Sequence, residues 1–166
     1  MGATIAGSHR RLERLAGANA VPALVATRAA LAHILSERLC DRPVLGHWRA
    51  LIEYLNVTMA HRRTEQVRLL HLNSRNVLIR DEALSEGTID KATLHLREVI
   101  SRCLELGTAG IIIAHNHPSG DPEPSRADIE TTRAIADAAD KFGIVLHDHI
   151  IVGAMGHVSM RTKGWI

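Results

Sequence analysis

Two histidines and an aspartate near the middle of the chain have the types and the spacing of metal ligands. His115 and His117 alternate at the end of an apolar run, and Asp128 follows on what reads as the first turn of a helix. Because side chains alternate across a strand with period two, both imidazoles should lie on one face. Two imidazoles and one carboxylate are the ligands that a catalytic zinc takes when its fourth position is kept for water. The spacing therefore indicates a metal-dependent hydrolase.

The same residues also have a purely structural interpretation. Histidines often lie at strand ends without a metal, so H-x-H alone is weak evidence. Ser125 and Asp128 match a capping box, in which the serine oxygen accepts an N–H of the first turn and the acid favours the positive end of the helix dipole. A carboxylate bound to zinc has fewer lone pairs for a backbone N–H. The two interpretations are therefore compatible only in part, and spacing alone leaves both open.

A longer string resembles a known family and favours the metal site. The segment AHNHPSGDPEPSRAD, residues 114–128, contains the two histidines, Ser125 and Asp128 at the spacing of the JAMM motif of MPN-domain metalloproteases. The full string resembles the bacterial RadC-like branch specifically. Further matches to that branch are Glu82 with Gly87-Thr88, Arg97-Glu98, DHIIVG at 148–153 and GWI at 164–166. The resemblance covers about residues 43–166.

This resemblance implies an α/β fold of the MPN or cytidine-deaminase-like kind, with a zinc ion bound by His115, His117 and Asp128. It also implies that Ser125 hydrogen-bonds the oxyanion formed when an amide carbonyl is attacked. The reaction expected from the family is cleavage of a peptide or isopeptide bond by a metal-activated water.

For the general base, the family pattern places a glutamate on the strand before a Gly-Thr pair, five residues upstream of the glycine. In this chain that residue is Glu82, which would accept a proton from the water and return it to the departing amine. Two other carboxylates remain alternatives. Asp81 should point to the opposite face because of strand alternation, and Glu86 lies next to the turn. Both otherwise read as solvated charges of a hairpin.

Bulk composition bounds the class of protein. The hydrophobic share is 46% but aromatic residues make up only 2%, so we expect an aliphatic core. A net charge of +2 is too mild to indicate nucleic-acid binding.

Cys40 and Cys103 stand in no metal or redox spacing, which indicates buried thiols and a reducing compartment. Without a membrane-spanning apolar run or a convincing signal peptide, a cytoplasmic protein is expected.

The hydrophobic pattern predicts a mixed β-sheet flanked by helices, with further helices at the N-terminus. The expected strands are 65–73, 77–84, 111–114 and 144–152, followed by a short last strand. The expected helices run from Pro22 to about Cys40, over about 48–59, over 97–106 and from Ser125 to Gly143. In the first of these helices, an apolar stripe is formed by Leu24, Leu31, Ile34 and Leu35.

We divide the chain into an N-terminal helical appendage, residues 1–42, and a RadC-like MPN domain, residues 43–166. RadC-like proteins usually carry a helix-hairpin-helix segment before this domain. Residues 1–40 contain no Gly-x-Gly hairpin, so this segment is expected to be truncated or degenerate. Residues 1–22 are small and basic with weak periodicity, and we expect them to be poorly ordered.

Two further groups of residues could be metal ligands or supports. His147-Asp148-His149 repeats the H-x-H spacing; Asp148 or His149 could instead orient a ligating imidazole, or bond at a strand end. Asp121 is either a spare ligand or a turn residue.

The leading hypothesis is thus a zinc metallopeptidase of the JAMM type, whose peptide or protein-conjugate substrate the sequence does not specify. The alternative is a DNA-repair-associated binding module without hydrolytic activity. Near-neutral charge and scarce aromatic residues argue against DNA binding, although a basic patch could form from Arg10, Arg11, Arg14, Arg62 and Arg63. A non-catalytic MPN scaffold would usually have lost a ligand or the glutamate, and this chain keeps both. The oligomeric state is not predicted.

Overall fold

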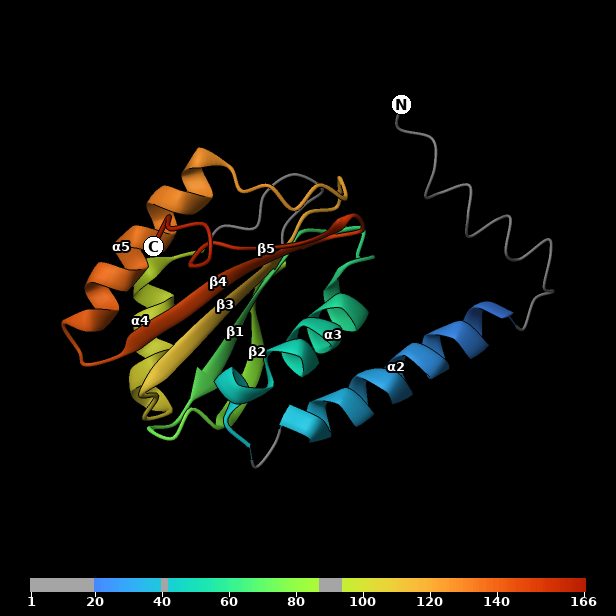
Figure 1. Cartoon of the computed structure of the whole chain (residues 1–166), viewed down its shortest axis with the longest axis horizontal. Helices are drawn as coiled ribbons and strands as arrows, with labels where there is room; N and C mark the ends of the chain where they lie inside the picture. Colours follow the sequence, from blue (N-terminus) through green and yellow to red (C-terminus); the bar gives the residue numbers. More distant parts are fainter. Residues whose placement is uncertain (1–19, 40–41, 87–93) are drawn as a thin grey trace.

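The computed structural model describes residues 20–39, 42–86 and 94–166. Its centre is a five-stranded sheet with the order β2-β1-β3-β4-β5 (Figure 1). The strands are β1 (Gln66–Leu72), β2 (Leu78–Glu86), β3 (Gly110–Asn116), β4 (Val145–Gly153) and β5 (Gly156–Ser159). β3 and β4 are parallel, whereas the other neighbouring strands are antiparallel. The predicted mixed α/β architecture is confirmed.

Helices cover both faces of this sheet (Figure 1). They are α2 (Ala20–Leu39), the short 3-10 helix η1 (Val44–His47), α3 (Trp48–Met59), α4 (Leu96–Glu105) and α5 (Arg126–Asp140). α4 and α5 pack on one face and α3 on the other, with α2 lying against α3 on its outer side. None of the described helices is long and apolar enough to cross a membrane.

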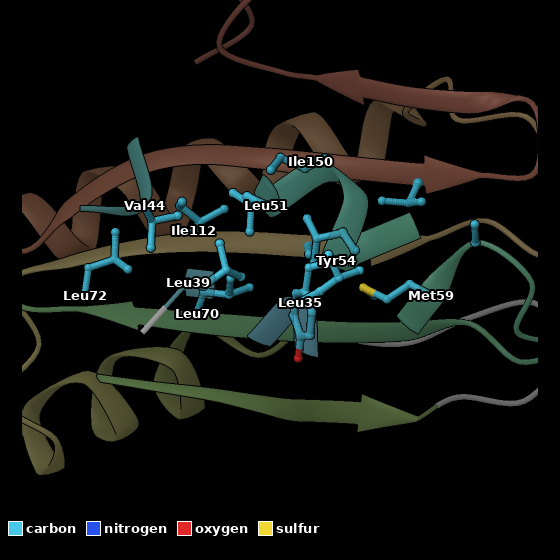
Figure 2. Packing of buried hydrophobic residues seen from close by; sticks show 14 residues of the cluster. Leu35, Leu39, Val44, Leu51, Tyr54, Met59, Leu70, Leu72, Ile112 and Ile150 are labelled. Atoms are coloured by element: carbon cyan, nitrogen blue, oxygen red, sulfur yellow. The ribbon is translucent and has the colours of Figure 1, made fainter. Parts of the chain in front are cut away.

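The central strand β3 is apolar throughout because both of its faces are covered. Ile112 and Ala114 pack into a cluster with the side chains of α3, including Leu51 and Leu55 (Figure 2). Ile111 and Ile113 point the other way, into a cluster with α4 and α5. A strand buried on both faces shows a continuous apolar run rather than alternation, as the sequence indicated for this segment.

The helix expected after Pro22 is present as α2, and its apolar stripe is only partly buried. Leu35 is buried, whereas Leu24, Leu31 and Ile34 are 51%, 43% and 49% exposed. The contact with α3 is instead partly polar: the Arg28 guanidinium donates to the carbonyl oxygens of Val57 and Thr58, at 2.7 and 2.6 Å. A cation at the C-terminal end of a helix satisfies carbonyls that have no partner within that helix. Leu24 and Leu31 lie on the same side of α2 as Arg28 and line one pocket with it. The expectation for residues 1–22 falls almost entirely outside the described residues, as does that for Cys40.

The difference in burial between Ile112 and Ile79 predicts that alanine substitutions at these two positions lower the stability of the protein by different amounts. Ile112→Ala should lower the free energy of unfolding by about 2–5 kcal/mol, because it leaves a cavity among fully buried side chains. Ile79→Ala makes the same chemical change in β2, where the side chain is 43% exposed, and should cost less than about 1 kcal/mol. Urea unfolding of both variants measures the difference. Equal losses would contradict the packing described here.

Candidate metal centre

β3 brings both histidines to one edge of the sheet. His115 is the penultimate residue of the strand and is buried. His117 follows the strand, but its N–H still donates to the Val152 carbonyl of β4 at 2.9 Å, which continues the pairing by one residue. The two rings lie edge to face with their centroids 4.7 Å apart. The strand geometry thus places both imidazoles on one face, as expected from the H-x-H spacing.

The His117 ring is oriented by the loop that follows it. Its Nδ1 lies 2.8 Å from the Asp121 carbonyl oxygen, which can only accept, so that Nδ1 carries the proton. The Nε2 lone pair is then directed away from the loop, and Nε2 lies 3.8 Å from Oδ2 of Asp128. The Asp121 carboxylate accepts a hydrogen bond from the Glu123 N–H at 3.0 Å, which fits a turn residue rather than a spare ligand.

Close backbone packing holds this loop against the β4–β5 hairpin. Gly120 has a φ of 92°, and its carbonyl oxygen accepts the Met155 N–H at 3.0 Å. A Cβ at Gly153 would stand 2.2 Å from that same oxygen, so a side chain cannot be accommodated there without displacing the loop. The position of His117 is therefore set from both ends of the loop.

Asp128 caps α5 and still presents one oxygen to the histidines. The Ser125 N–H and hydroxyl both donate to Oδ2, at 2.8 and 2.6 Å, and the Asp128 N–H donates back to the Ser125 oxygen at 3.2 Å. This is a complete capping box. Oδ1, which takes no part in the box, lies 3.7 Å from Nδ1 of His115. Because the carboxylate has two oxygens, the capping and metal-ligand interpretations are compatible.

The structure brings these three residues together into a group that could hold a metal ion. Each of His115, His117 and Asp128 offers one ligand atom, and these atoms lie within 4.8 Å of one another. Zinc bonds of about 2.0–2.2 Å keep ligand atoms within about 4 Å of each other, so small side-chain rotations would close the group around an ion. His117 and Asp128 are partly exposed, which leaves one side of the group open to solvent.

A carboxylate that the sequence analysis did not single out lies beside this group. Glu65 directly precedes β1, and its Oε1 is 2.6 Å from Nε2 of His115. The approach follows from strand pairing, because Val67 is the register partner of His115. The sequence shows an acidic residue at the start of a predicted strand, but it does not show that this strand is a neighbour of β3.

Glu82, the expected base, is held elsewhere on the same face. Its carboxylate accepts two hydrogen bonds from Arg102 of α4, at 2.8 and 2.7 Å, and lies 3.1 Å from Nε2 of His71. Glu82 is the register partner of Leu69, which pairs with Ile113, two residues before His115, but its carboxylate bonds His71, the partner of Ile111. The Arg102 guanidinium, and to a lesser extent His71, lower the pKa of Glu82. In this structure the carboxylate of Glu82 is thus occupied by Arg102 and His71, and its role as the general base stays a prediction.

The two alternative carboxylates are also placed by β2. Asp81 points to the opposite face, as alternation predicted, and bonds Tyr54 of α3 at 2.5 Å and Arg68 at 2.9 Å. Glu86 is the last residue of β2, and its side chain lies outside the described part of the structure.

The second H-x-H segment lies in β4 and forms no metal-binding group among the described residues. Asp148 accepts hydrogen bonds from Ser159 and from the Arg161 N–H, which tie β4 to the C-terminal segment. His149 is 2% exposed, and its ring centroid is 5.9 Å from that of His115. Burial, reinforced by His115 and His117, lowers its pKa to about 3, so His149 is neutral at physiological pH.

Comparison with known proteins adds family relationships to this geometry. Residues 45–165 match the model of the RadC-like JAB domain family. The chain is 43% identical over 165 residues to a UPF0758 protein of Rhodobacter capsulatus, covering 98% of this chain and 77% of that protein. It is also 43% identical over 160 residues to a UPF0758 protein of Ruegeria pomeroyi, covering 93% of this chain and 71% of the relative.

The position of Glu82 predicts a pH-dependent contribution to stability. Because its pKa is lower in the folded protein than the ordinary value of 4.5, the carboxylate stabilises the fold at neutral pH and loses this effect as the pH falls. Glu82→Gln should lower the free energy of unfolding by about 2 kcal/mol at pH 7 and by less at pH 4. Urea unfolding at both pH values measures this difference.

Glu53→Gln provides the control. It breaks an exposed pair with Arg49 and should cost less than about 1 kcal/mol at pH 7. A Glu82→Gln variant as stable as the wild type at pH 7 would contradict the described network.

Proposed function

The chain belongs to the RadC-like JAB domain family, and we propose that it is a zinc-dependent hydrolase that cleaves a peptide or isopeptide bond. The observation that carries the proposal is the convergence of His115, His117 and Asp128 from two elements onto one point. Two imidazoles and a carboxylate suit zinc, and three protein ligands leave a position open for water or substrate.

The hydrogen bonds around His117 and Asp128 direct donor atoms of both residues toward a place where a divalent cation could bind. The His117 tautomer leaves the Nε2 lone pair on the side of Asp128, and the capping box leaves Oδ1 of Asp128 on the side of His115. A zinc ion bound by these atoms would polarise the amide carbonyl and make water acidic enough to supply a nucleophile near neutral pH.

Glu65 is the residue that we propose as the general base. Its carboxylate lies against His115, and its side chain is only 14% exposed. At this position it can accept a proton from the attacking water and return it to the departing amine. Glu82 cannot take this part without leaving Arg102, its bidentate partner.

For Ser125 we propose that the first role is to orient Asp128. Its single hydroxyl proton is donated to Oδ2, at 2.6 Å. Hydrogen bonding to an oxyanion, the role that the family resemblance implies, requires this hydroxyl to turn away from Asp128 during the reaction. The backbone N–H of Ser125 also donates to Oδ2 and would hold the carboxylate when the hydroxyl turns.

Metal content of the purified protein tests the cation site directly. The wild type should contain about one zinc per chain by mass spectrometry of the elements, and His117→Ala should lose it, since one of three ligands is removed. His47→Ala, which removes an exposed histidine of η1, should keep the wild-type content. A wild type that takes up no zinc even when the ion is supplied would reject the proposal.

Hydrolysis of a proteome-derived peptide mixture, read as new N-termini by mass spectrometry, tests the base. Glu65→Gln should retain zinc yet cleave at least about 100-fold more slowly, because the amide cannot accept the proton. Glu82→Gln should retain both zinc and cleavage. The opposite result, with loss only in Glu82→Gln, would restore the assignment made from the sequence and remove Glu65 from the mechanism.

A further inference from the structure

His149 contacts both elements that carry the candidate ligands. It lies in β4, where it is the register partner of Ile113 in β3. Its ring lies at an interplanar angle of 34° to the His115 ring, with 5.9 Å between the centroids. Its Nδ1 is 2.6 Å from the Thr132 hydroxyl in α5, and that hydroxyl also bonds the Asp128 carbonyl oxygen at 2.5 Å. His149 thus connects the strand that bears His115 with the helix that bears Asp128.

The hydrogen bonds of Thr132 determine which nitrogen of His149 carries the proton. A hydroxyl has one proton, and the Asp128 carbonyl oxygen can only accept, so the Thr132 proton goes to Asp128. The Thr132 oxygen must then accept from His149, whose Nδ1 is protonated. A neutral imidazole with its proton on Nδ1 has a lone pair on Nε2.

This lone pair is buried and has no hydrogen-bond partner among the described residues. Buried polar atoms are nearly always hydrogen-bonded, so an exception calls for a specific reason. The ring that carries this nitrogen lies 5.9 Å from the His115 ring and is joined through Thr132 to Asp128. The unsatisfied nitrogen therefore belongs to a residue that borders the candidate cation site.

We propose that His149 is a positioning residue of the cation site. It holds the His115 ring by packing and Asp128 through Thr132, and its Nε2 accepts a hydrogen bond from a water or substrate group held in the site. Groups that orient metal ligands typically change metal affinity by 10–100-fold when removed. The inference rests on the proposed function, because it assigns a role toward the same bound ion.

Affinity for Zn²⁺, measured by competition with a chromophoric chelator, tests the proposal with His149→Phe. This variant keeps an aromatic ring of similar shape and removes both nitrogens. Zn²⁺ should bind at least about tenfold more weakly, and the visible absorption spectrum of the Co²⁺-loaded protein should change because the ligand geometry changes. The unfolding temperature of the metal-free protein should change little, because removal of a buried acceptor without a partner among the described residues offsets loss of the hydrogen bond to Thr132.

A matched pair at Thr132 provides a second route to the same role. Thr132→Val keeps the volume of the side chain and removes the hydroxyl that joins His149 to Asp128, so affinity should fall as in His149→Phe. Thr132→Ser keeps the hydroxyl and should retain wild-type affinity. Wild-type affinity in both His149→Phe and Thr132→Val would overturn the proposal.

His71→Phe separates a role at the site from a general role of buried histidines. Both nitrogens of His71 are bonded, at 2.8 Å to Thr108 and 3.1 Å to Glu82, so this change should lower the unfolding temperature but leave Zn²⁺ affinity unchanged. A His149→Phe protein that is destabilised without loss of affinity would make His149 a core residue only. A wild type that binds no Zn²⁺ would overturn the proposed function, and with it this inference.

Discussion

The candidate site depends on the backbone pairing of β3 with a neighbour on each side. Antiparallel pairing with β1 sets Val67 opposite His115 and so brings Glu65 to the histidine end of the strand. Parallel pairing with β4 sets His149 opposite Ile113. A slip of one residue would turn the imidazole of His115 to the α3 face, away from Asp128. The isoleucines of β3, fully buried on both faces, prevent such a slip because it would exchange their two packing environments.

Asp128 shows how one side chain can serve both the fold and the site. Its Oδ2 accepts both hydrogen bonds from Ser125, the N-cap residue of α5, while Oδ1 lies on the side of His115. A helix start needs an acceptor near its first N–H groups, and a cation site needs a carboxylate at a fixed place. Because capping fixes the carboxylate before any ion binds, little side-chain freedom remains to be lost on binding.

The same face of the sheet contains two polar groups with different electrostatics. At one end, Glu82 is neutralised by the Arg102 guanidinium, a permanent cation, and also lies 3.1 Å from Nε2 of His71. At the other end, Oε1 of Glu65 and Oδ1 of Asp128 lie beside the His115 ring. A guanidinium neutralises the carboxylate that it pairs with, whereas carboxylates and imidazole nitrogens gathered at one place are the ligands that a divalent ion takes. The first group therefore stabilises the fold, and the second suits a divalent ion.

Local sequence determined the three candidate ligands and the order of strands and helices. His115, His117 and Asp128 lie within one strand–loop–helix unit, where period-two alternation and a capping box dictate which side chains meet. Only the tertiary structure decided that Glu65 rather than Glu82 lies beside His115, and that His149 borders the same group. Those contacts depend on which strands neighbour β3 and in which register. Periodicity within a single strand carries no information about its neighbours, because the same alternation fits any position in the sheet.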